Sequence, residues 1–330
     1  MDNNDSGFDA NKDFQDQIIN EDWKKHRSRE YFDYREMWEN VPANKIETDF
    51  PLNVDIETTD VCNLQCPMCS RTIKANIGMI EERMITREEY SSLIDQCVEH
   101  GAKAIKLNYD GEPLSHKDVV WHVKYAKERG IVDVLINTNA TLLKGKKAEP
   151  LLAAGLDTLI ISFDAVSPDL YGDARVGTTI GIVIDNVYSI VKLRNEKYPG
   201  CQIKMQMVMY DEPMWRDQFE AMKVMWGRLV DSLGYSPVVS WKKKTEDPFA
   251  EVKGWWCSQP LQRMVLKING KVSVCCPDIW DEIVVGDWRK ERLVDIWNGE
   301  KFSDIRRRHT EGDYYSIEAC RRCCYPHLEK

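Results

Sequence analysis

Residues 52–69 read LNVDIETTDVCNLQCPMC, in which a short apolar strand leads directly into three closely spaced cysteines. Cys62, Cys66 and Cys69 stand in a C-x3-C-x2-C spacing. Three thiolates on one tight loop suit an iron–sulfur cubane and leave one of its irons without a protein ligand. A zinc site completed from elsewhere in the chain, or a plain electron-transfer cluster, remains the alternative.

From residue 52 to residue 241 the chain alternates strand-like and helix-like segments. The expected strands cover residues 52–57, 104–108, 132–136, 158–163, 203–209 and 238–241. The expected helices cover residues 86–101, 115–130, 144–154, 179–198 and 214–233, with a capping box formed by Thr86 and Glu89 at the start of the first. Six such repeats predict an α/β fold, a partial (β/α)6 barrel in which chemistry lies at the carboxyl ends of parallel strands.

The chain is expected to divide into three parts. Residues 1–50 form an N-terminal tail and helical extension, in which 1–14 are frayed and 15–40 hold a helix or two. Residues 51–241 form the barrel. Residues 242–330 form a small domain that contains six cysteines. A domain of this size buries little apolar core, so a metal centre is expected to stabilise it.

Composition narrows the class of protein. The 330 residues carry 45 basic and 54 acidic side chains, a net charge of −9, which disfavours bulk binding of nucleic acid. The 11 cysteines are odd in number and clustered, unlike a disulfide framework. The acidic N-terminus is unlike a secretory signal, and the sequence has no apolar stretch long enough to span a membrane. A reducing cytoplasm is therefore the expected location, with no membrane partner.

The motif CNLQCPMC, placed after a first barrel strand, resembles the cluster motif of radical S-adenosylmethionine (SAM) enzymes. Three further segments match the pattern of that family in order: DGEP at 110–113, where the family has GGEP; NTN at 137–139; and SFD at 162–164, followed by Tyr171 and Arg175. Asp110 stands in place of the first glycine. The resemblance covers residues 50–241.

The resemblance implies that Cys62, Cys66 and Cys69 hold a 4Fe–4S cluster whose open iron chelates SAM. Reduction of this cluster by a flavodoxin- or ferredoxin-type donor would cleave SAM to a 5′-deoxyadenosyl radical, which abstracts hydrogen from a substrate carbon. The implied SAM-binding residues are Gly111 and Glu112 for the methionyl ammonium, Asn139 and Ser162 for ribose or carboxylate, and Arg175 for the methionyl carboxylate. The alternatives are turn caps for Asn139 and Ser162 and a surface ion pair for Arg175.

The C-terminal cysteines follow a second pattern. The spacing C-x12-G-x4-C from Cys257 to Cys275, with C-x2-C at Cys320 and Cys323, resembles the SPASM/twitch extension of many radical SAM enzymes. The chain ends seven residues after Cys323, so one auxiliary 4Fe–4S cluster is expected, with these four cysteines as its ligands. A zinc site made by the same four thiolates remains the alternative.

Cys276 and Cys324 are left over beside these ligands. Each of the two is either a buried thiol or a cluster ligand in place of its neighbour. By resemblance to related epimerases, Cys276 is the candidate catalytic residue, a hydrogen-atom donor to a substrate radical. The six histidines show no ligand spacing and receive no role.

The sequence therefore predicts a radical SAM oxidoreductase that epimerises or dehydrogenates a small molecule such as a sugar or aminocyclitol. One alternative is a SPASM-type maturase of ribosomally made peptides, which the short N-terminal segment disfavours. The other alternative is a non-catalytic zinc or iron–sulfur scaffold.

Overall fold

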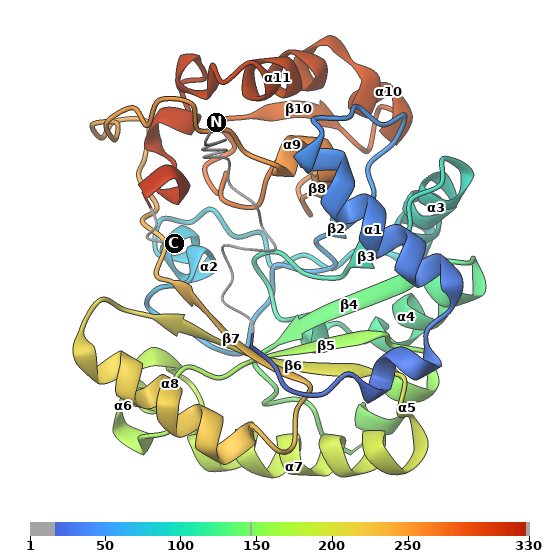
Figure 1. The fold of residues 1–330 in the computed structure, drawn as a ribbon, viewed down its shortest axis with the longest axis vertical. Coiled ribbons are helices and arrows are strands. Elements are labelled where there is room, and N and C mark those ends of the chain that lie inside the picture. The colour runs from blue at the N-terminus through green and yellow to red at the C-terminus, as the bar shows by residue number, and fades with distance from the viewer. Residues whose placement is uncertain (1–16, 146, 328–330) are drawn as a thin grey trace, which may run out of the picture.

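The computed structural model describes residues 17–145 and 147–327, whose strands form one ten-stranded sheet (Figure 1). The strand order is β1-β7-β6-β5-β4-β3-β2-β8-β9-β10. The strands are β1 Gln17–Ile18, β2 Asn53–Ile56, β3 Ala104–Lys106, β4 Asp133–Thr138, β5 Thr158–Ser162, β6 Gln202–Met209, β7 Ser232–Pro237, β8 Arg263–Leu266, β9 Lys271–Ser273 and β10 Val284–Asp287. Strands β2 to β7 pair in parallel in chain order, which confirms the α/β class and the partial barrel.

Helices connect successive parallel strands and cover the outside of the sheet, with α7 and α8 along the lower edge of Figure 1. The helices are α1 Arg29–Ala43, α2 Ser70–Ala75, α3 Arg87–Glu99, α4 Val119–Glu128, α5 Ala148–Ala153, α6 Pro168–Ala174, α7 Ile180–Lys197, α8 Pro213–Trp226, α9 Gln259–Gln262, α10 Leu293–Asn298 and α11 Glu300–Thr310. Short 3-10 turns η1 to η5 cover Asp22–His26, Pro113–Ser115, Tyr314–Ser316, Cys320–Arg322 and Tyr325–His327.

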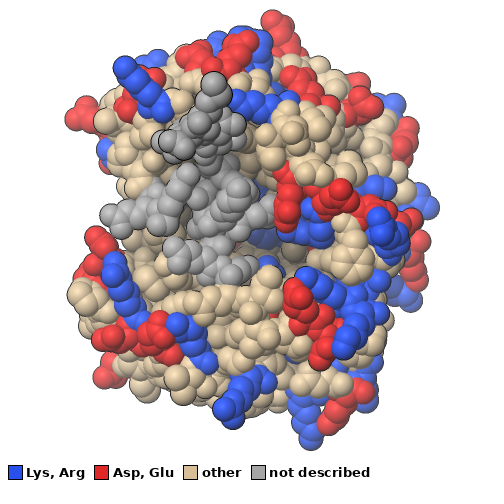
Figure 2. Space-filling model, viewed as in Figure 1, with Lys and Arg blue, Asp and Glu red and all other residues tan. Residues whose placement is uncertain are grey.

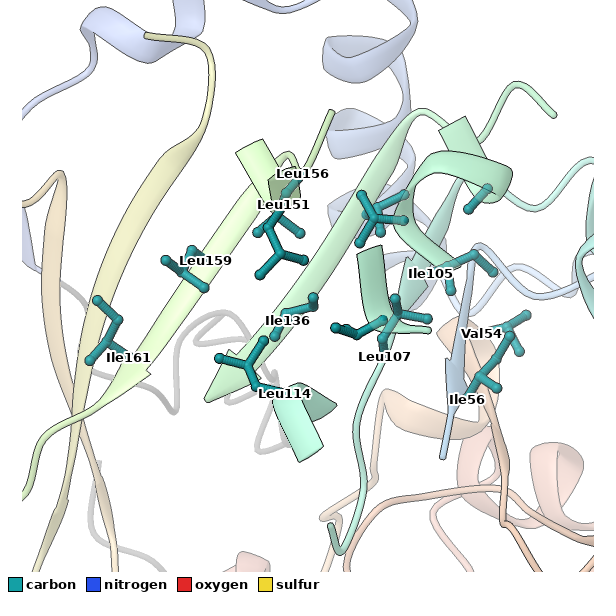
Figure 3. Close-up of a cluster of buried hydrophobic side chains, with 14 of the residues drawn as sticks. Val54, Ile56, Ile105, Leu107, Leu114, Ile136, Leu151, Leu156, Leu159 and Ile161 are labelled. Carbon is teal, nitrogen blue, oxygen red and sulfur yellow. The ribbon is translucent and has the colours of Figure 1, made fainter. Parts of the chain in front are cut away.

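The main core lies between the parallel strands and these helices (Figure 3). Apolar side chains of neighbouring strands point into it beside residues of α5 and the turn that follows, and Figure 3 labels Val54, Ile56, Ile105, Leu107, Leu114, Ile136, Leu151, Leu156, Leu159 and Ile161. The helices cover one face of the sheet and exclude water from it. Polar functional groups are therefore expected at the carboxyl ends of the strands.

The largest difference from the sequence prediction lies in the sixth strand–helix repeat. The sixth parallel strand is β7 at Ser232–Pro237, and the predicted strand at 238–241 is wrong. Residues 232–237 pair with β6, which ends at Met209, so the chain beyond them has passed the end of its partner strand. The preceding helix correspondingly ends at Trp226, with Gly227 as its C-cap.

The N-terminal extension covers two places on the barrel. β1 pairs antiparallel with β7 and extends the far edge of the sheet. Helix α1 buries Tyr34 and Trp38 in a second cluster together with Trp256 and Leu261. η1 and α1 lie in the part of the chain where the helical extension was predicted, and the predicted frayed tail at 1–14 lies outside the described residues.

The C-terminal third continues the same sheet. β8 pairs in parallel with β2 and antiparallel with β9, which in turn pairs with β10. Division of the chain at residue 241 stays a prediction. No helix among the described residues is long and apolar enough to cross a bilayer. Basic and acidic side chains alternate over the face shown in Figure 2.

Candidate functional site

The three N-terminal cysteines lie on the loop between β2 and α2. Cys62, Cys66 and Cys69 line one cavity whose empty volume is about 610 Å³, including space open to solvent. Burial raises the pKa of the Cys62 thiol to about 11 and raises those of the other two thiols as well. Thiols of this kind release their protons when they bind metal, so iron must supply the free energy that ionises them.

The DGEP segment packs directly against this loop. A Cβ atom at Gly111 would lie 2.1 Å from the carbonyl oxygen of Thr59, so only glycine allows the approach. Asp110, which replaces the family's first glycine, accepts hydrogen bonds from Ser70 Oγ at 2.7 Å and Lys74 Nζ at 2.5 Å. Asp110 therefore fixes the start of α2, the helix that follows Cys69.

Glu112 is buried in the wall of the cavity and accepts hydrogen bonds from three donors. Its Oε1 accepts from Leu114 N at 3.0 Å and Thr138 Oγ1 at 2.7 Å, and its Oε2 accepts from Asn139 N at 2.8 Å. Burial raises the pKa of the carboxyl, while these hydrogen bonds oppose the rise. Since a carboxylate has about four acceptor positions, one on Oε2 is left for a ligand.

Asn139 holds the cysteine loop to the end of β4. Its Nδ2 donates to Asn63 Oδ1 at 3.0 Å, and its Oδ1 accepts from Thr141 N at 3.0 Å and Thr141 Oγ1 at 2.6 Å. The Asn63 side chain also donates to Thr141 Oγ1 at 2.7 Å. The Asn139 amide is thus engaged by the protein, which matches the turn-cap alternative, although its predicted contact with SAM remains a prediction.

Arg175 lies against both a carboxylate and a cysteine. Its guanidinium forms a buried ion pair with Asp164, and its Nη1 donates to Cys66 Sγ at 3.7 Å. Asp164 also accepts from Val208 N at 2.8 Å. Arg175 and Ser162 line the cavity, and their predicted contacts with SAM stay predictions. The surface-pair alternative for Arg175 does not fit, because both members of its ion pair are buried.

Two amides that the sequence analysis did not single out as binding residues complete the cavity. Asn108 follows β3 and Asn137 belongs to β4, and both line the cavity. The Oδ1 atom of each is buried and has no hydrogen-bond partner among the described residues. Their places at neighbouring strand ends were the available signal, because such positions face the ligand in parallel α/β folds.

The C-terminal cysteines surround a second cavity. Its empty volume is about 740 Å³, and the lining includes all four expected ligands: Cys257, Cys275, Cys320 and Cys323. Cys324 also lines it. Among the described residues, no three histidine, cysteine or acidic side chains converge closely enough to chelate one metal ion. The thiols instead surround a shared cavity. A multi-iron cluster requires this arrangement, because each of its irons binds its own thiolate.

His309 lies in this second cavity, although the sequence analysis gave no histidine a role. Its Nδ1 accepts from Cys257 N at 3.2 Å, and its Nε2 lies 3.6 Å from Cys320 Sγ. The ring is 2% exposed, and burial lowers the pKa of His309 to about 4. His309 lies on the buried face of α11 with Phe302 and Ile305, and no metal-ligand spacing in the sequence indicated its place in the cavity.

The Cys276 thiol contacts Gln259, a residue that lines the second cavity. Its Sγ donates to Gln259 Oε1 at 3.6 Å, and Cys276 is absent from the described residues that line either cavity. It lies near Tyr109, a residue of the first cavity whose pKa is raised mainly by burial and in part by Cys276. The predicted role of Cys276 as a hydrogen donor stays a prediction.

Family models match both halves of this arrangement. Residues 56–215 match the radical SAM superfamily, and residues 257–324 match the SPASM iron–sulfur cluster-binding domain. The chain is a radical SAM protein with a C-terminal SPASM domain. Each matched segment contains the cysteine site that its spacing predicted.

Curated relatives share the radical SAM part of the chain. GTP 3′,8-cyclase of Limosilactobacillus fermentum is 35% identical over 158 residues, which are 47% of this chain and 45% of the relative. Probable GTP 3′,8-cyclase of Methanocaldococcus jannaschii is 36% identical over 116 residues, 35% of this chain and 37% of the relative. The chain therefore spans less than half the length of these curated relatives.

Solved structures share the fold over most of the chain. BtrN, crystallised with AdoMet and 2-DOIA, has a TM-score of 0.55 at 16% identity, covering 84% of this chain and 94% of BtrN. SuiB of Streptococcus suis, bound to the precursor peptide SuiA, has a TM-score of 0.59 at 14% identity. The match covers 82% of this chain and 70% of SuiB. At these identities the likeness establishes the fold alone.

The cofactors follow from the two domains. The radical SAM domain implies a SAM-binding 4Fe–4S cluster, and the SPASM domain implies auxiliary iron–sulfur chemistry. The residues present fit these groups, because each cavity is walled by its own cysteines. The predicted SAM and iron–sulfur cofactors are therefore confirmed at the level of the domains, while the individual ligands remain predictions.

Proposed function

We propose that this radical SAM enzyme removes a hydrogen atom from a carbon of a small polyhydroxylated molecule, such as a sugar or aminocyclitol. The observation that carries the proposal is the pair of amides, Asn108 and Asn137, whose buried oxygens have no partner among the described residues. A buried polar atom without a partner costs about 1–3 kcal/mol, so these oxygens are suited to meet the donors of a ligand.

The chemistry of the amides matches hydroxyl groups. An amide presents an acceptor oxygen and a donor nitrogen, and a hydroxyl group is both donor and acceptor. Asn108 and Asn137 lie at neighbouring strands, which are about 4.8 Å apart, a separation that the substituents of one small ring can bridge. The BtrN structure, with AdoMet and 2-DOIA bound to the same fold, agrees with a small-molecule substrate.

The protein's own groups bind and orient the reactants. The remaining acceptor position of Glu112 is suited to the SAM ammonium group, and Ser162, which lines the same cavity, is suited to the ribose or carboxylate of SAM. Arg175, held by Asp164, lines the same cavity and donates to Cys66 Sγ. When bound, SAM and its cluster supply a hydrogen-abstracting radical, and an auxiliary cluster supplies a one-electron acceptor.

Dehydrogenation of an alcohol to a ketone is the outcome that the geometry favours. The Cys276 thiol is hydrogen-bonded to Gln259, whereas epimerisation requires it to deliver a hydrogen atom into the first cavity. Epimerisation is the second candidate because Cys276 lies near Tyr109, which lines that cavity.

The test is anaerobic turnover of the holoenzyme with SAM and carbon-deuterated sugars and aminocyclitols. Deuterium should appear in 5′-deoxyadenosine, and a product two hydrogens lighter than its substrate should form. Asn108→Ala and Asn137→Ala should each raise the KM at least about tenfold, the effect of losing a bond of about 1.4 kcal/mol. The exposed variant Asn298→Ala is the matched control.

Further arms of the same assay separate the alternatives. Unchanged product from Cys276→Ala agrees with dehydrogenation, and loss of an epimerised product would establish the thiol donor instead. Deuterium transfer only from labelled GTP, the substrate class that the names of the curated relatives indicate, would refute the proposal. Transfer only from a peptide, as the SuiB complex suggests, would refute it equally.

A further inference from the structure

His309 makes two directed contacts inside the second cavity. The backbone N–H of Cys257 donates to its Nδ1 at 3.2 Å, and its Nε2 lies 3.6 Å from Cys320 Sγ. Trp255 and Tyr314 pack around the ring, with centroid separations of 6.2 Å and 6.5 Å. The imidazole is therefore held between two of the expected cluster ligands.

These contacts determine where the ring proton lies. A backbone N–H can only donate, so Nδ1 of His309 must be the acceptor and carries no proton. In a neutral imidazole the proton is then on Nε2, which faces Cys320 Sγ. The geometry thus gives an N–H···S hydrogen bond from His309 to Cys320.

We propose that His309 sets the reduction potential of the auxiliary iron–sulfur cluster through this hydrogen bond. A donor directed at a cluster thiolate withdraws negative charge from sulfur, so it stabilises the reduced, more negative state more than the oxidised one. His309 is accordingly a positioning and tuning residue that acts through Cys320, and the inference rests on Cys320 being a ligand.

Two substitutions test the contacts of the ring: His309→Phe removes both the Nε2 donor and the acceptor for the Cys257 N–H group, and the amide of His309→Gln can restore both. His122→Phe is the control, because His122 is equally buried but has no recorded hydrogen bond on either ring nitrogen among the described residues. All variants are prepared anaerobically as holoenzyme, and iron and sulfide are counted.

The readout is the midpoint potential of each cluster in an EPR-monitored titration, with SAM added to identify the cluster that has the open iron. His309→Phe should lower the midpoint potential of the auxiliary cluster by up to about 59 mV, which corresponds to a tenfold change in a one-electron redox equilibrium. His309→Gln and His122→Phe should stay near wild type, and the SAM-cluster potential should not move. An unchanged auxiliary potential in fully loaded His309→Phe overturns the proposal.

A wild-type measurement covers the case in which His309→Phe fails to load. Reduced holoenzyme with 15N-labelled histidine should show a weak 15N coupling to the auxiliary cluster in electron spin-echo spectra, and absence of that coupling overturns the proposal. Full iron content in Cys320→Ala would also overturn it, by showing that Cys320 is no ligand. That outcome leaves the hydrogen-abstraction function untouched, so the two failures are distinguishable.

Discussion

The two cysteine sites differ in what surrounds their thiols. The first is walled by amides, carboxylates and Arg175, and some of its polar atoms have no partner among the described residues. Aromatic rings such as Trp241, Trp255 and Trp280 line much of the second, and the carboxylate of Asp278 there is directed at Ser273 and nearby backbone. The first site is therefore arranged to receive a polar ligand, and the aromatic lining of the second encloses its thiols.

Removal of one thiol from each site should have the largest effect and should separate the two. Cys66→Ala should abolish SAM cleavage and lower iron from about eight to about four atoms per chain. Cys320→Ala should lose a similar amount of iron but keep cleavage of SAM. Iron, sulfide and 5′-deoxyadenosine are measured on anaerobic protein, and loss of cleavage in both variants would break the proposed division of roles.

Gly111→Ala should be the next largest change. Its Cβ would meet the Thr59 carbonyl oxygen at 2.1 Å, so the DGEP segment must move, at a cost of about 1–3 kcal/mol in the free energy of unfolding. SAM affinity should fall with it, while the auxiliary-cluster spectrum stays unchanged. Gly181→Ala in α7, where the new Cβ meets nothing within 4 Å, is the control and should stabilise by about 0.5–1 kcal/mol.

Asn139→Ala should have a moderate effect that is confined to the first site. It removes the bonds to Asn63 and Thr141, worth about 1–2 kcal/mol, so a chelator should extract iron from that site faster. Equilibrium dialysis of the loaded fraction should show a SAM Kd within about threefold of wild type. A much larger rise in Kd would show that Asn139 contacts SAM directly.

Cys324→Ala should have the smallest effect. Cys324 lines the second cavity but lies beside Cys323, which completes the expected set of four ligands. Iron content should stay near eight atoms per chain, and the free energy of unfolding should fall by about 1 kcal/mol through lost packing. A loss of about four iron atoms would make Cys324 the ligand in place of its neighbour.

Local signals in the sequence predicted most of the barrel. The capping box at Thr86 forms as expected, with Glu89 returning a hydrogen bond to the N-cap backbone. β7 escaped prediction because its residues, SLGYSP, carry turn-like glycine and proline, and its place depends on pairing with β6. Pairing with a distant strand overrides local propensity, which single-sequence patterns do not record.

The site was predictable where residues lie close together in sequence. Cysteine spacing and the DGEP segment located the first cavity, and Glu112 and Arg175 line it, while their predicted roles in binding SAM stay predictions. The contact partners of these residues were harder to predict from the sequence. Side-chain directions in the folded chain determine the ion pair of Arg175 with Asp164 and the contact of His309 with Cys320. Asp110 could not be interpreted until the structure showed Lys74 beside it.

Strand β2 has a further consequence for how the two sites work together. β2 leads into the first cysteine loop and pairs in parallel with β8. β8 forms a hairpin with β9, which leads to Cys275. Because neighbouring strands of a sheet lie about 4.8 Å apart, the sheet fixes the separation of the two cysteine sites. Residues added to or deleted from the loop at 242–256 would change the path of the chain and leave the separation of the two cysteine sites as it is.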